Sequence, residues 1–464
     1  MSGLREVLAE VINRVKPNAK DREMVMSVVN KIKGNLEKEA RARGLKVRVE
    51  IEGSLAKDTW VATDRDIDLF IIFPHGTSKE VVKEVGLELA KAGVGEGWRL
   101  GYAEHPYVEA FVGGYTVDIV PSVEIGEGER PVTAVDRTPL HTKFVLKKLD
   151  ERMRDDVRLL KQFMKGIGVY GAELKVGGFS GYLCELLVIN YGSFQGVLQE
   201  ATKWKGRTVI DYMKYYREGE AEQVFDSPLV IIDPVDRRRN AAAAVSLQCY
   251  ATFIAAANRF LEKPSVEYFF PVTEGVDIYK VLEKSKERGT SLVVIKTGCP
   301  KLPSDVLWGE IQKSLTKTVG LLERHDFRVL DQKAWSDEER HVIFMLELES
   351  RRLREGKIHL GPKAWYHEDV RKFLEKHLKG ENVLAGPSIK EDRWYVEIKR
   401  KYKEVKELLG REFVKLQLSK DIMEEVKKGF RIYADEEIAE LCTEEPRLIN
   451  EINALTRKRP PWLN

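Results

Sequence analysis

The chain has 464 residues, of which 43% are hydrophobic, and at about 150 residues per domain it should form roughly three domains with their own cores. A fibrous or largely disordered chain is excluded. Its 77 basic and 74 acidic residues nearly balance, so any affinity for nucleic acid must come from local patches. We expect no membrane span, because the longest apolar runs fall short of about 20 residues. We also expect no signal peptide, because Arg5, Glu6 and Glu10 interrupt any apolar run at the start. Four cysteines, each at least 50 residues from the next, argue against a zinc site or disulfide framework and favour a reducing cytoplasm.

The first part of the chain mixes helix and strand patterns. Apolar residues at helical spacing predict a helix over residues 21–43. Residues 46–51 alternate charged and β-branched side chains, residues 67–73 are rich in Ile and Phe, and residues 107–120 should form two strands around Gly113-Gly114. This order predicts a mixed α/β domain.

Helical patterns then follow one another from residue 155 to about residue 261, which predicts a helical second domain. Strand signals return at residues 291–296, 327–330 and 341–349, with an amphipathic helix between the first two. They predict a small α/β module, which a late strand at residues 394–398 should join. The predicted fold class is therefore α+β with several domains.

The residues most informative about chemistry lie where one strand ends at Gly53-Ser54 and another begins at Asp66. Side chains alternate across a strand, so Asp66 and Asp68 should share one face while Ile67 and Leu69 enter the core. Two neighbouring carboxylates repel each other, and divalent cations would neutralise that repulsion. The alternative is that these are ordinary solvated strand residues.

A third carboxylate follows on the predicted hairpin. If Gly113-Gly114 is a two-residue turn, Val117 and Ile119 point into the core and Asp118 points to the opposite face. Three carboxylates on one open face suit two Mg²⁺ ions, since Mg²⁺ keeps several waters and binds one or two carboxylates plus substrate phosphates.

Competing motifs lack their key residues. A calcium loop opening at Asp64 would need Gly where Leu69 stands and Glu where His75 stands. The glycine-rich patterns of P-loop and dinucleotide-binding proteins, and the His-Glu-x-x-His of zincins, are absent from the sequence.

Gly53-Ser54, eleven residues, Asp66-Ile67-Asp68-Leu69 and then Asp118 resemble the signature of the DNA polymerase β-like nucleotidyltransferase superfamily. Further sequence motifs narrow the resemblance to the archaeal-type (class I) CCA-adding enzymes, which build the CCA end of tRNA. These motifs are Tyr102–Val108, Ala134–Pro139, Val157–Lys161, Tyr170–Glu173, Gly178–Glu185 and Asp233–Asn240.

The resemblance implies four parts: a polymerase β-like catalytic head, a helical neck, an α/β body and a small α/β tail that grips tRNA. It also implies that the enzyme adds CCA, or completes a partial CCA end, from CTP and ATP without a nucleic-acid template. Oligomeric state stays open, with a homodimer as one alternative. The expected boundaries are 1–145 for the head, 146–262 for the neck, 263–330 with 381–464 for the body, and 331–380 for the tail.

Carried over position by position, the resemblance assigns Asp66, Asp68 and Asp118 to two Mg²⁺ ions, with Asp66 standing where relatives often have Glu. Lys57 replaces an Arg of relatives, which puts a bidentate phosphate grip there in doubt. The positions that match nucleotide-binding residues are Gly53, Ser54, Lys57, His105, Thr138, His141, Lys161, Tyr170 and Arg239.

Simpler readings of these residues stay open on the sequence alone. Lys161, with Arg158 and Lys165, could form a solvated helix face, and His105 could be a packing or surface residue. Arg239 matches the family's base-reading arginine, but without the family it would be part of a charge run, Arg237 to Arg239, near a helix start.

One stretch carries a local charge suited to RNA. Residues 351–380 contain nine basic and four acidic residues, interleaved with Trp365, Tyr366 and Phe373. Phosphate contacts and base stacking would use these groups, although solvated helix faces often look similar. The candidate RNA-binding residues are Arg351, Arg352, Lys363, Arg371 and Lys372.

Rival functions remain to be separated. A poly(A) polymerase of the same superfamily would add runs of A and ignore CTP. A non-catalytic RNA-binding protein would not need three intact carboxylates. Transfer of nucleotides to a small molecule such as an aminoglycoside would not need the additional α/β module and basic tail.

Overall fold

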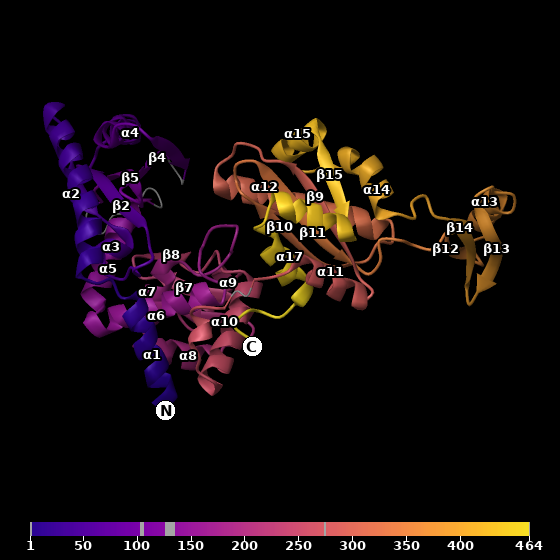
Figure 1. The fold of residues 1–464 in the computed structure, drawn as a ribbon, viewed down its shortest axis with the longest axis horizontal. Helices are drawn as coiled ribbons and strands as arrows, with labels where there is room; N and C mark the ends of the chain where they lie inside the picture. Colours follow the sequence, from indigo (N-terminus) through magenta and orange to yellow (C-terminus); the bar gives the residue numbers. More distant parts are fainter. Residues whose placement is uncertain (1, 103–105, 126–134, 273–274, 464) are drawn as a thin grey trace. The chain divides into compact units, whose positions relative to one another are not determined.

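The structure is a computed structural model that describes residues 2–102, 106–125, 135–272 and 275–463 (Figure 1). Its chain divides into two compact units, Met1–Val272 with Pro460–Asn464, and Thr273–Arg459. Among the helices of the described residues, none is both long and apolar enough to cross a membrane.

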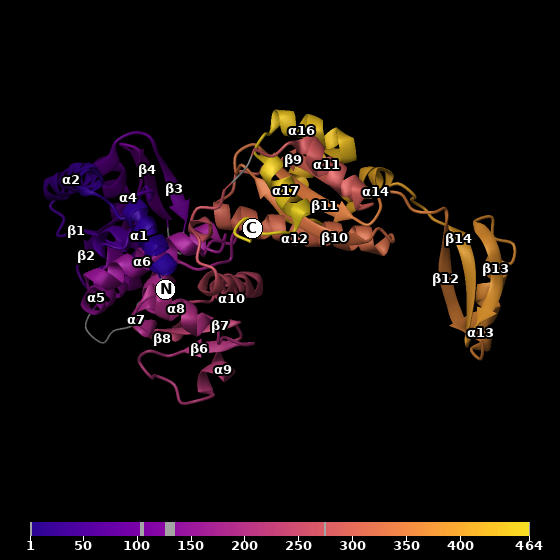
Figure 2. The ribbon, with the colours of Figure 1, turned by 60° about the horizontal axis from the view of Figure 1, so that its bottom comes forward.

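The first unit contains a five-stranded sheet in the order β1-β2-β5-β4-β3. Strands β2 and β5 run parallel, and the other neighbours are antiparallel. Ile67, Leu69 and Ile71 of β2 alternate into a core shared with helices α2 and α4, which lie beside the sheet in Figure 2. The predicted first helix and strands are confirmed. The elements are β1 (Arg48–Ile51), β2 (Asp66–Phe73), β3 (Trp98–Tyr102), β4 (Pro106–Val112), β5 (Tyr115–Val123), α2 (Ala19–Ala42), α3 (Gly53–Ala56) and α4 (Lys79–Val94).

The β4–β5 hairpin turns at the predicted glycines. Gly113 and Gly114 have φ values of +60° and +85°, a left-handed conformation that glycine adopts readily. Val112 therefore pairs directly with Tyr115. This register buries Val117 and Ile119 completely and leaves Asp118 on the other face, as expected.

The rest of the first unit is largely helical, around an aromatic core in which Phe163 contacts Phe194, Phe253 and Phe260. The prediction of an all-helical segment is wrong in one respect, because the structure adds a three-stranded sheet, β6-β7-β8. Its strands have three to five residues, too few to show clear alternation in sequence. The elements are α1 (Ser2–Val15), η1 (Val135–Arg137), α5 (Thr138–Lys148), α6 (Glu151–Gly166), α7 (Gly181–Tyr191), α8 (Phe194–Ala201), β6 (Thr208–Ile210), α9 (Glu220–Val224), β7 (Leu229–Asp233), β8 (Asp236–Asn240), α10 (Leu247–Glu262) and η2 (Val266–Tyr268).

The second unit has a four-stranded sheet, β10-β11-β9-β15, buried on both faces. Val293 and Ile295 of β9 pack into one core with helices α12, α14 and α15, while Leu292 and Val294 enter another core with α11, α16 and α17. Strands β10 and β11 pair here, although their residues fall within the expected tail range. The elements are α11 (Ile278–Glu287), β9 (Ser291–Gly298), α12 (Ser304–Arg324), β10 (Val329–Ser336), β11 (His341–Leu348), α14 (Val405–Glu412), η3 (Phe413–Lys415), α15 (Lys420–Lys428), β15 (Phe430–Ala434), η4 (Asp435–Glu437), α16 (Ile438–Glu444) and α17 (Leu448–Arg457).

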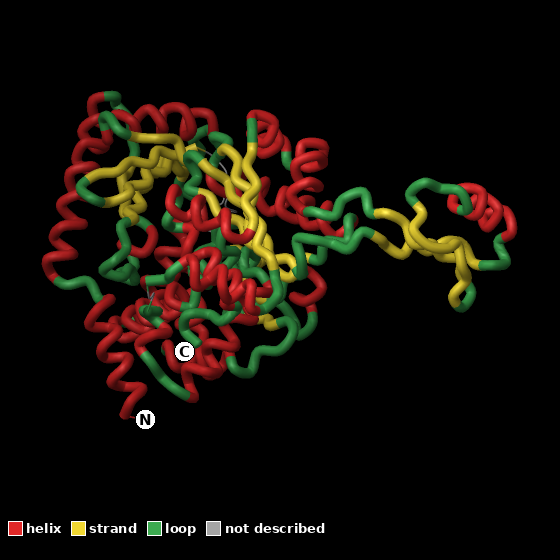
Figure 3. The backbone as a smooth tube through the Cα atoms, turned by 45° about the vertical axis from the view of Figure 1, so that its right-hand side comes forward, coloured by secondary structure: helices red, strands yellow, loops and turns green. Residues whose placement is uncertain are grey.

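A separate three-stranded sheet, β12-β14-β13, carries one helix, α13, drawn as a red helix beside yellow strands in Figure 3. His359 of β12 lies 6.2 Å, ring to ring, from Phe373 of α13. The late strand at residues 394–398 is the centre of this sheet, so the prediction that it joins the preceding α/β module is wrong. The elements are β12 (Gly356–Lys363), α13 (His367–His377), β13 (Val383–Lys390) and β14 (Arg393–Lys399).

Candidate active site

The chain turns from β1 into the short helix α3 directly beside the carboxylate of Asp68. The backbone N–H of Glu52 donates to the carbonyl oxygen of Asp68 at 2.9 Å. Gly53 follows with φ +65°, and a Cβ atom built there would lie 1.8 Å from Oδ2 of Asp68. Only glycine allows the backbone to approach this carboxylate so closely.

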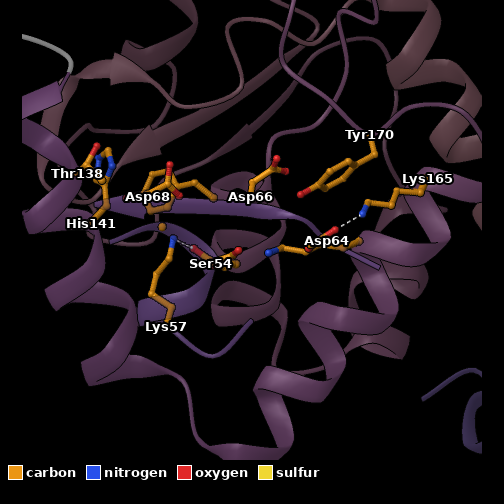
Figure 4. A pocket seen from close by; sticks show the side chains of 14 residues that line it. Ser54, Lys57, Asp64, Asp66, Asp68, Thr138, His141, Lys165 and Tyr170 are labelled. Atoms are coloured by element: carbon orange, nitrogen blue, oxygen red, sulfur yellow. Dashed lines mark hydrogen bonds and ion pairs between the residues drawn. The ribbon is translucent and has the colours of Figure 1, made fainter. Parts of the chain in front are cut away.

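The three predicted carboxylates lie on neighbouring strands. Asp68 of β2 is the register partner of Asp118 in the parallel strand β5, and Asp66 precedes Asp68 by two residues. Figure 4 shows Asp66 and Asp68 on the same side of their strand. Burial, followed by the negative charge of Asp68, raises the pKa of Asp118 to about 7. Burial is also the main reason that the pKa values of Asp66 and Asp68 are raised.

These side chains fit a divalent cation in chemistry but do not yet converge on one point. Oδ1 of Asp118 is buried and has no hydrogen-bond partner among the residues that the structure describes, which is costly unless a ligand or ion satisfies it. Yet within the described part of the chain no three His, Cys, Asp or Glu side chains are arranged to hold a metal ion. To bind one cation together, the carboxylates would have to turn toward it, and the cation would neutralise their mutual repulsion.

Two lysines lie in a buried polar cluster beside the turn after α3. Lys57 donates to Oε2 of Glu185 at 2.5 Å, and the hydroxyl of Thr59 donates to Oε1 of Glu185 at 2.5 Å. Nζ of Lys161, from α6, donates to the carbonyl oxygen of Thr59 at 3.0 Å. Burial lowers the pKa of Lys161, and the carboxylate of Glu185 opposes that shift.

Arg158 also bonds to this turn, at residues 58–60. Its side chain is 1% exposed, and it donates to the carbonyl oxygens of Asp58 and Trp60 and to the carboxylates of Asp58 and Asp155. Asp58 itself has φ +52°, a conformation that needs such support in a residue other than glycine. The reading of Arg158 and Lys161 as a solvated helix face is therefore wrong.

The far side of the pocket carries Lys165 and Tyr170. Nζ of Lys165 donates to Oδ1 of Asp64 at 2.5 Å and lies 5.1 Å from the ring centroid of Tyr170. Burial raises the pKa of Tyr170, so its hydroxyl stays protonated at neutral pH. A Cβ on Gly181 would lie 3.1 Å from that hydroxyl, which shows how closely the backbone of α7 approaches it.

A second buried carboxylate, Asp233, organises the opposite side. Its Oδ2 accepts hydrogen bonds from Nε2 of His141 at 2.9 Å and from Nη1 of Arg239 at 2.7 Å. Its Oδ1 accepts from the hydroxyl of Tyr182 at 3.2 Å. Burial alone would raise the pKa of Asp233, but the hydrogen bond and charge of His141, with Val235 N–H and Arg239, lower it to about 2. Burial lowers the pKa of His141, and the hydrogen bond and charge of Asp233 oppose that shift.

One pocket gathers most of the residues predicted from the sequence (Figure 4). Asp118 lies on the neighbouring strand, and Arg239 is joined to the pocket through Asp233 and His141. The arginine run occupies strand β8, so its reading as a helix start is wrong. His105 lies outside the described residues. The predicted residues that line the pocket are Gly53, Ser54, Lys57, Asp66, Asp68, Thr138, His141, Lys161 and Tyr170.

Comparison with known proteins shows the family. A CCA-adding enzyme of Sulfurisphaera tokodaii is 40% identical over 407 residues, which cover 87% of this chain and 90% of the relative. The chain belongs to the CCA-adding enzyme family. The family's enzyme from Saccharolobus shibatae is 42% identical and covers 83% of this chain and 89% of its own length. The one from Methanothermobacter thermautotrophicus is 38% identical, with coverages of 91% and 92%.

Three domain families match successive segments of this chain. A nucleotidyltransferase domain matches residues 33–141, the second domain of tRNA nucleotidyltransferase matches 155–270, and the C-terminal domain of CCA-adding enzyme matches 288–435. The predicted fold class, α+β with a polymerase β-like nucleotidyltransferase head, is confirmed. Among solved structures, a Cid1 poly(U) polymerase is 16% identical with a TM-score of 0.45, covering 56% of this chain and 94% of that chain. That likeness adds nothing to the family assignment.

Sequence reasoning gave no role to several pocket residues of this CCA-adding chain. Glu185 is the one charged residue of the mostly apolar helix α7, and a lone acid in such a helix is a signal, because a buried charge needs a partner. Asp233 ends the fully buried strand β7 and carries the same signal. The sequence gives no comparable signal for three other residues, Tyr182, Asp64 and Lys165, because residues of these types occur on many protein surfaces.

The candidate RNA-binding residues lie in the second unit. Arg351 and Arg352 precede β12 and form ion pairs with Glu404, and Arg351 also pairs with Asp435 at 2.6 Å. In the β12-β14-β13 sheet and its helix α13, Lys363 pairs with Asp392 at 3.0 Å, and Arg371 pairs with Glu368 at 2.9 Å. Trp365 and Tyr366 are 54% and 53% exposed. Lys372 is exposed on α13.

Proposed function

We propose that this protein adds C, C and A to the 3′ end of tRNA, without a nucleic-acid template, from CTP and ATP with release of pyrophosphate. It also completes partial CCA ends. The observation that supports this most strongly is the family likeness over nearly the whole chain, including the C-terminal domain of CCA-adding enzymes. The Gly53 turn against Asp68, with Asp118 on the adjacent strand, supplies a site for the chemistry.

Asp66, Asp68 and Asp118 would hold the metal. Nucleotidyltransferases of this superfamily use divalent cations, and we assign two Mg²⁺ ions here. Bound there, the ions would lower the charge of the triphosphate and the pKa of the RNA 3′-hydroxyl. The three carboxylates would hold the reacting groups at one face of the sheet, over the neighbouring strands β2 and β5. A bound ion would also satisfy Oδ1 of Asp118, which has no hydrogen-bond partner among the described residues.

The triphosphate would lie against Gly53, Ser54, Lys57, Lys161 and Tyr170. The two lysines are held by hydrogen bonds in a buried network, and Tyr170 brings a protonated hydroxyl. Groups fixed before the substrate arrives need no reorganisation when negative charge builds up on the phosphates. The leaving pyrophosphate would be stabilised by the same cations.

The nucleobase would occupy the side of Thr138, His141 and Arg239, with His105 as a further predicted contact. Arg239 offers N–H donors in a fixed fork, which suits recognition of base edges. The growing RNA end would complete this pocket, which accepts CTP first and ATP last.

The parts of the chain would divide the work. Residues 1–145 act as catalytic head and 146–262 as neck, while the four-stranded sheet is the body and β12–β14 with α13 are the tail. The tail would bind tRNA through phosphate contacts and stacking, with Arg351 and Arg352 at its base. A homodimer and a cytoplasmic location remain predictions.

A nucleotide-omission assay tests the function. With tRNA lacking CCA and with Mg²⁺, CTP alone should give addition of two residues, ATP alone none, and both together three. Long A runs from ATP alone would instead identify a poly(A) polymerase. No incorporation with any nucleotide, together with retained tRNA binding, would identify a non-catalytic RNA-binding protein.

A further inference from the structure

Asp233 lies at the meeting point of three elements in the first unit. Its side chain is fully buried at the end of β7, and it contacts His141 of α5, Tyr182 of α7 and Arg239 of β8. The backbone N–H of Val235 donates to its Oδ1 at 3.0 Å, so both carboxylate oxygens are in use. A carboxylate with so many donors is a rigid anchor, since moving it would break several charge-assisted bonds together.

The carboxylate also fixes the hydrogen-bonding polarity of its partners. Because an ionised carboxylate only accepts, the Nε2 atom of His141 must carry the proton that it donates. In a neutral imidazole the other nitrogen, Nδ1, is then an acceptor. The ring of Tyr182 stacks on His141 at 4.0 Å between centroids and holds its plane. Nη1 of Arg239 binds Asp233, and the guanidinium has further N–H groups.

We propose that Asp233 is a positioning residue for nucleotide selection, which holds Arg239 as a donor and His141 as an acceptor toward the incoming base. This inference rests on the proposed function. The carboxylate does not touch the nucleotide; it acts through His141, Tyr182 and Arg239. Without its negative charge the arginine fork is released and the imidazole is free to change tautomer or turn.

The chemistry of the bases shows why this polarity matters. Cytosine and adenine each carry an amino donor beside an unprotonated ring nitrogen. Uracil and guanine carry a carbonyl acceptor beside a ring N–H donor. A pocket with one hydrogen-bond donor and one acceptor in fixed places can pair with cytosine and adenine. In the same pocket, uracil and guanine would bring donor against donor and acceptor against acceptor. A buried polar group left facing the wrong partner costs much more than a missing contact.

The test is nucleotide selectivity in Asp233→Asn, which keeps the shape of the side chain and removes its charge. With tRNA lacking CCA, the ratio of kcat/KM for CTP to that for UTP should fall about tenfold or more, the scale of losing a good bidentate base contact. A ratio equal to that of the wild type in the folded variant would overturn the inference. Asp236→Asn is the matched control, because Asp236 lies on the same hairpin and pairs with Arg137 and Arg238.

A double-mutant cycle separates positioning from general structure. If Asp233 acts through Arg239, adding Asp233→Asn to Arg239→Met should lower the ratio little further, while fully additive losses would contradict the proposal. Should Asp233→Asn fail to fold, Tyr182→Phe removes one donor to Asp233 and should lower the ratio at least twofold; an unchanged ratio would count against it. A wild-type enzyme without preference for CTP over UTP would refute the proposed function itself.

Discussion

At the scale of single residues, the site depends on a glycine, Gly53, as much as on the carboxylates. Gly53 combines a positive φ with close contact to Asp68, so any larger residue there meets two penalties. Sequence spacing pointed to Gly53-Ser54, Asp66 and Asp68, because strand alternation fixes which face each residue takes. It could not show that the turn touches the carboxylate, since that contact depends on the pairing of β1 with β2.

Gly53→Ala should therefore lower CCA addition about a hundredfold, because displacing a reacting group by about 1 Å costs that much. Gly44→Ala is the control, since Gly44 also has a positive φ, +68°, but a Cβ there meets nothing within 4 Å. Steady-state rates and thermal melting of both variants decide the matter. Equal activity of the two variants would show that contact with Asp68 is unimportant.

The pKa of Asp118 gives a pH-dependent expectation. Its value is about 7 in the folded chain against an ordinary 3.8, so the folded state binds the extra proton. Stability from this group is therefore present at low pH and lost as the pH rises from about 4 to about 7. Glu52, whose pKa burial also raises to about 7, adds to the same window.

In metal-free protein, the Tm of the wild type should fall between pH 5 and pH 8. The Tm of Asp118→Asn should fall less, because the contribution of Asp118 is then absent. Mg²⁺ at pH 8 should raise the Tm of the wild type more than that of the variant. Thermal melts in chelator and in Mg²⁺ measure both effects. Parallel curves for the two proteins would refute the role given to Asp118.

At the scale of elements, helix α6 holds the turn at residues 58–60, which directly follows the predicted nucleotide-binding residues Gly53, Ser54 and Lys57. Arg158 and Lys161 come from successive turns of α6, and both bond to residues 58–60. The helical pattern predicted α6 but suggested that these residues were solvated, because a helical pattern does not reveal which polar residues have buried partners. Likewise, the short strand β8 gave no signal in the sequence, and its arginines looked like the start of a helix.

Arg158→Met should lower the free energy of unfolding by about 3 kcal/mol, near the low end for breaking a buried ion pair, since Arg22 remains 2.8 Å from Asp58. It should also raise KM for CTP through loss of the turn. Arg154→Met is the control, because Arg154 lies 3.9 Å from Asp58 and should contribute less than about 1 kcal/mol. Urea denaturation measures both. Similar losses would mean that the buried bonds of Arg158 stabilise little.

At the scale of the whole molecule, sequence patterns located strands better than they assigned them to sheets. Residues 394–398 showed clear strand character, but alternation does not name a partner strand, and β14 pairs with β12 and β13. The sequence was enough to place the three carboxylates in one site, because only one strand and one hairpin had to be predicted to bring together Asp66, Asp68 and Asp118. The partners of Glu185 and Asp233 could not be predicted in this way, because they come from three or four segments that are distant in the sequence.

The basic tail should act on tRNA and not on nucleotides. Arg371→Ala with Lys372→Ala should raise KM for tRNA several-fold and lower the salt slope of binding by about two, one for each lost phosphate contact. KM for CTP should stay unchanged. Lys427→Ala with Lys428→Ala, two exposed neighbours on α15, is the control. Equal tRNA affinity in both double variants would remove these residues from the interface.

The most direct test of the metal site is Mg²⁺-dependent incorporation of labelled CTP by Asp68→Ala and Asp118→Ala, with folding checked by circular dichroism. Glu109→Gln is the matched control, since Glu109 is the register partner of Asp118 on β4 but is paired with Arg99 at 2.5 Å. We expect both aspartate variants to fold and to add no nucleotide, while the control remains active. Full incorporation by either aspartate variant would contradict the assignment of the catalytic carboxylates.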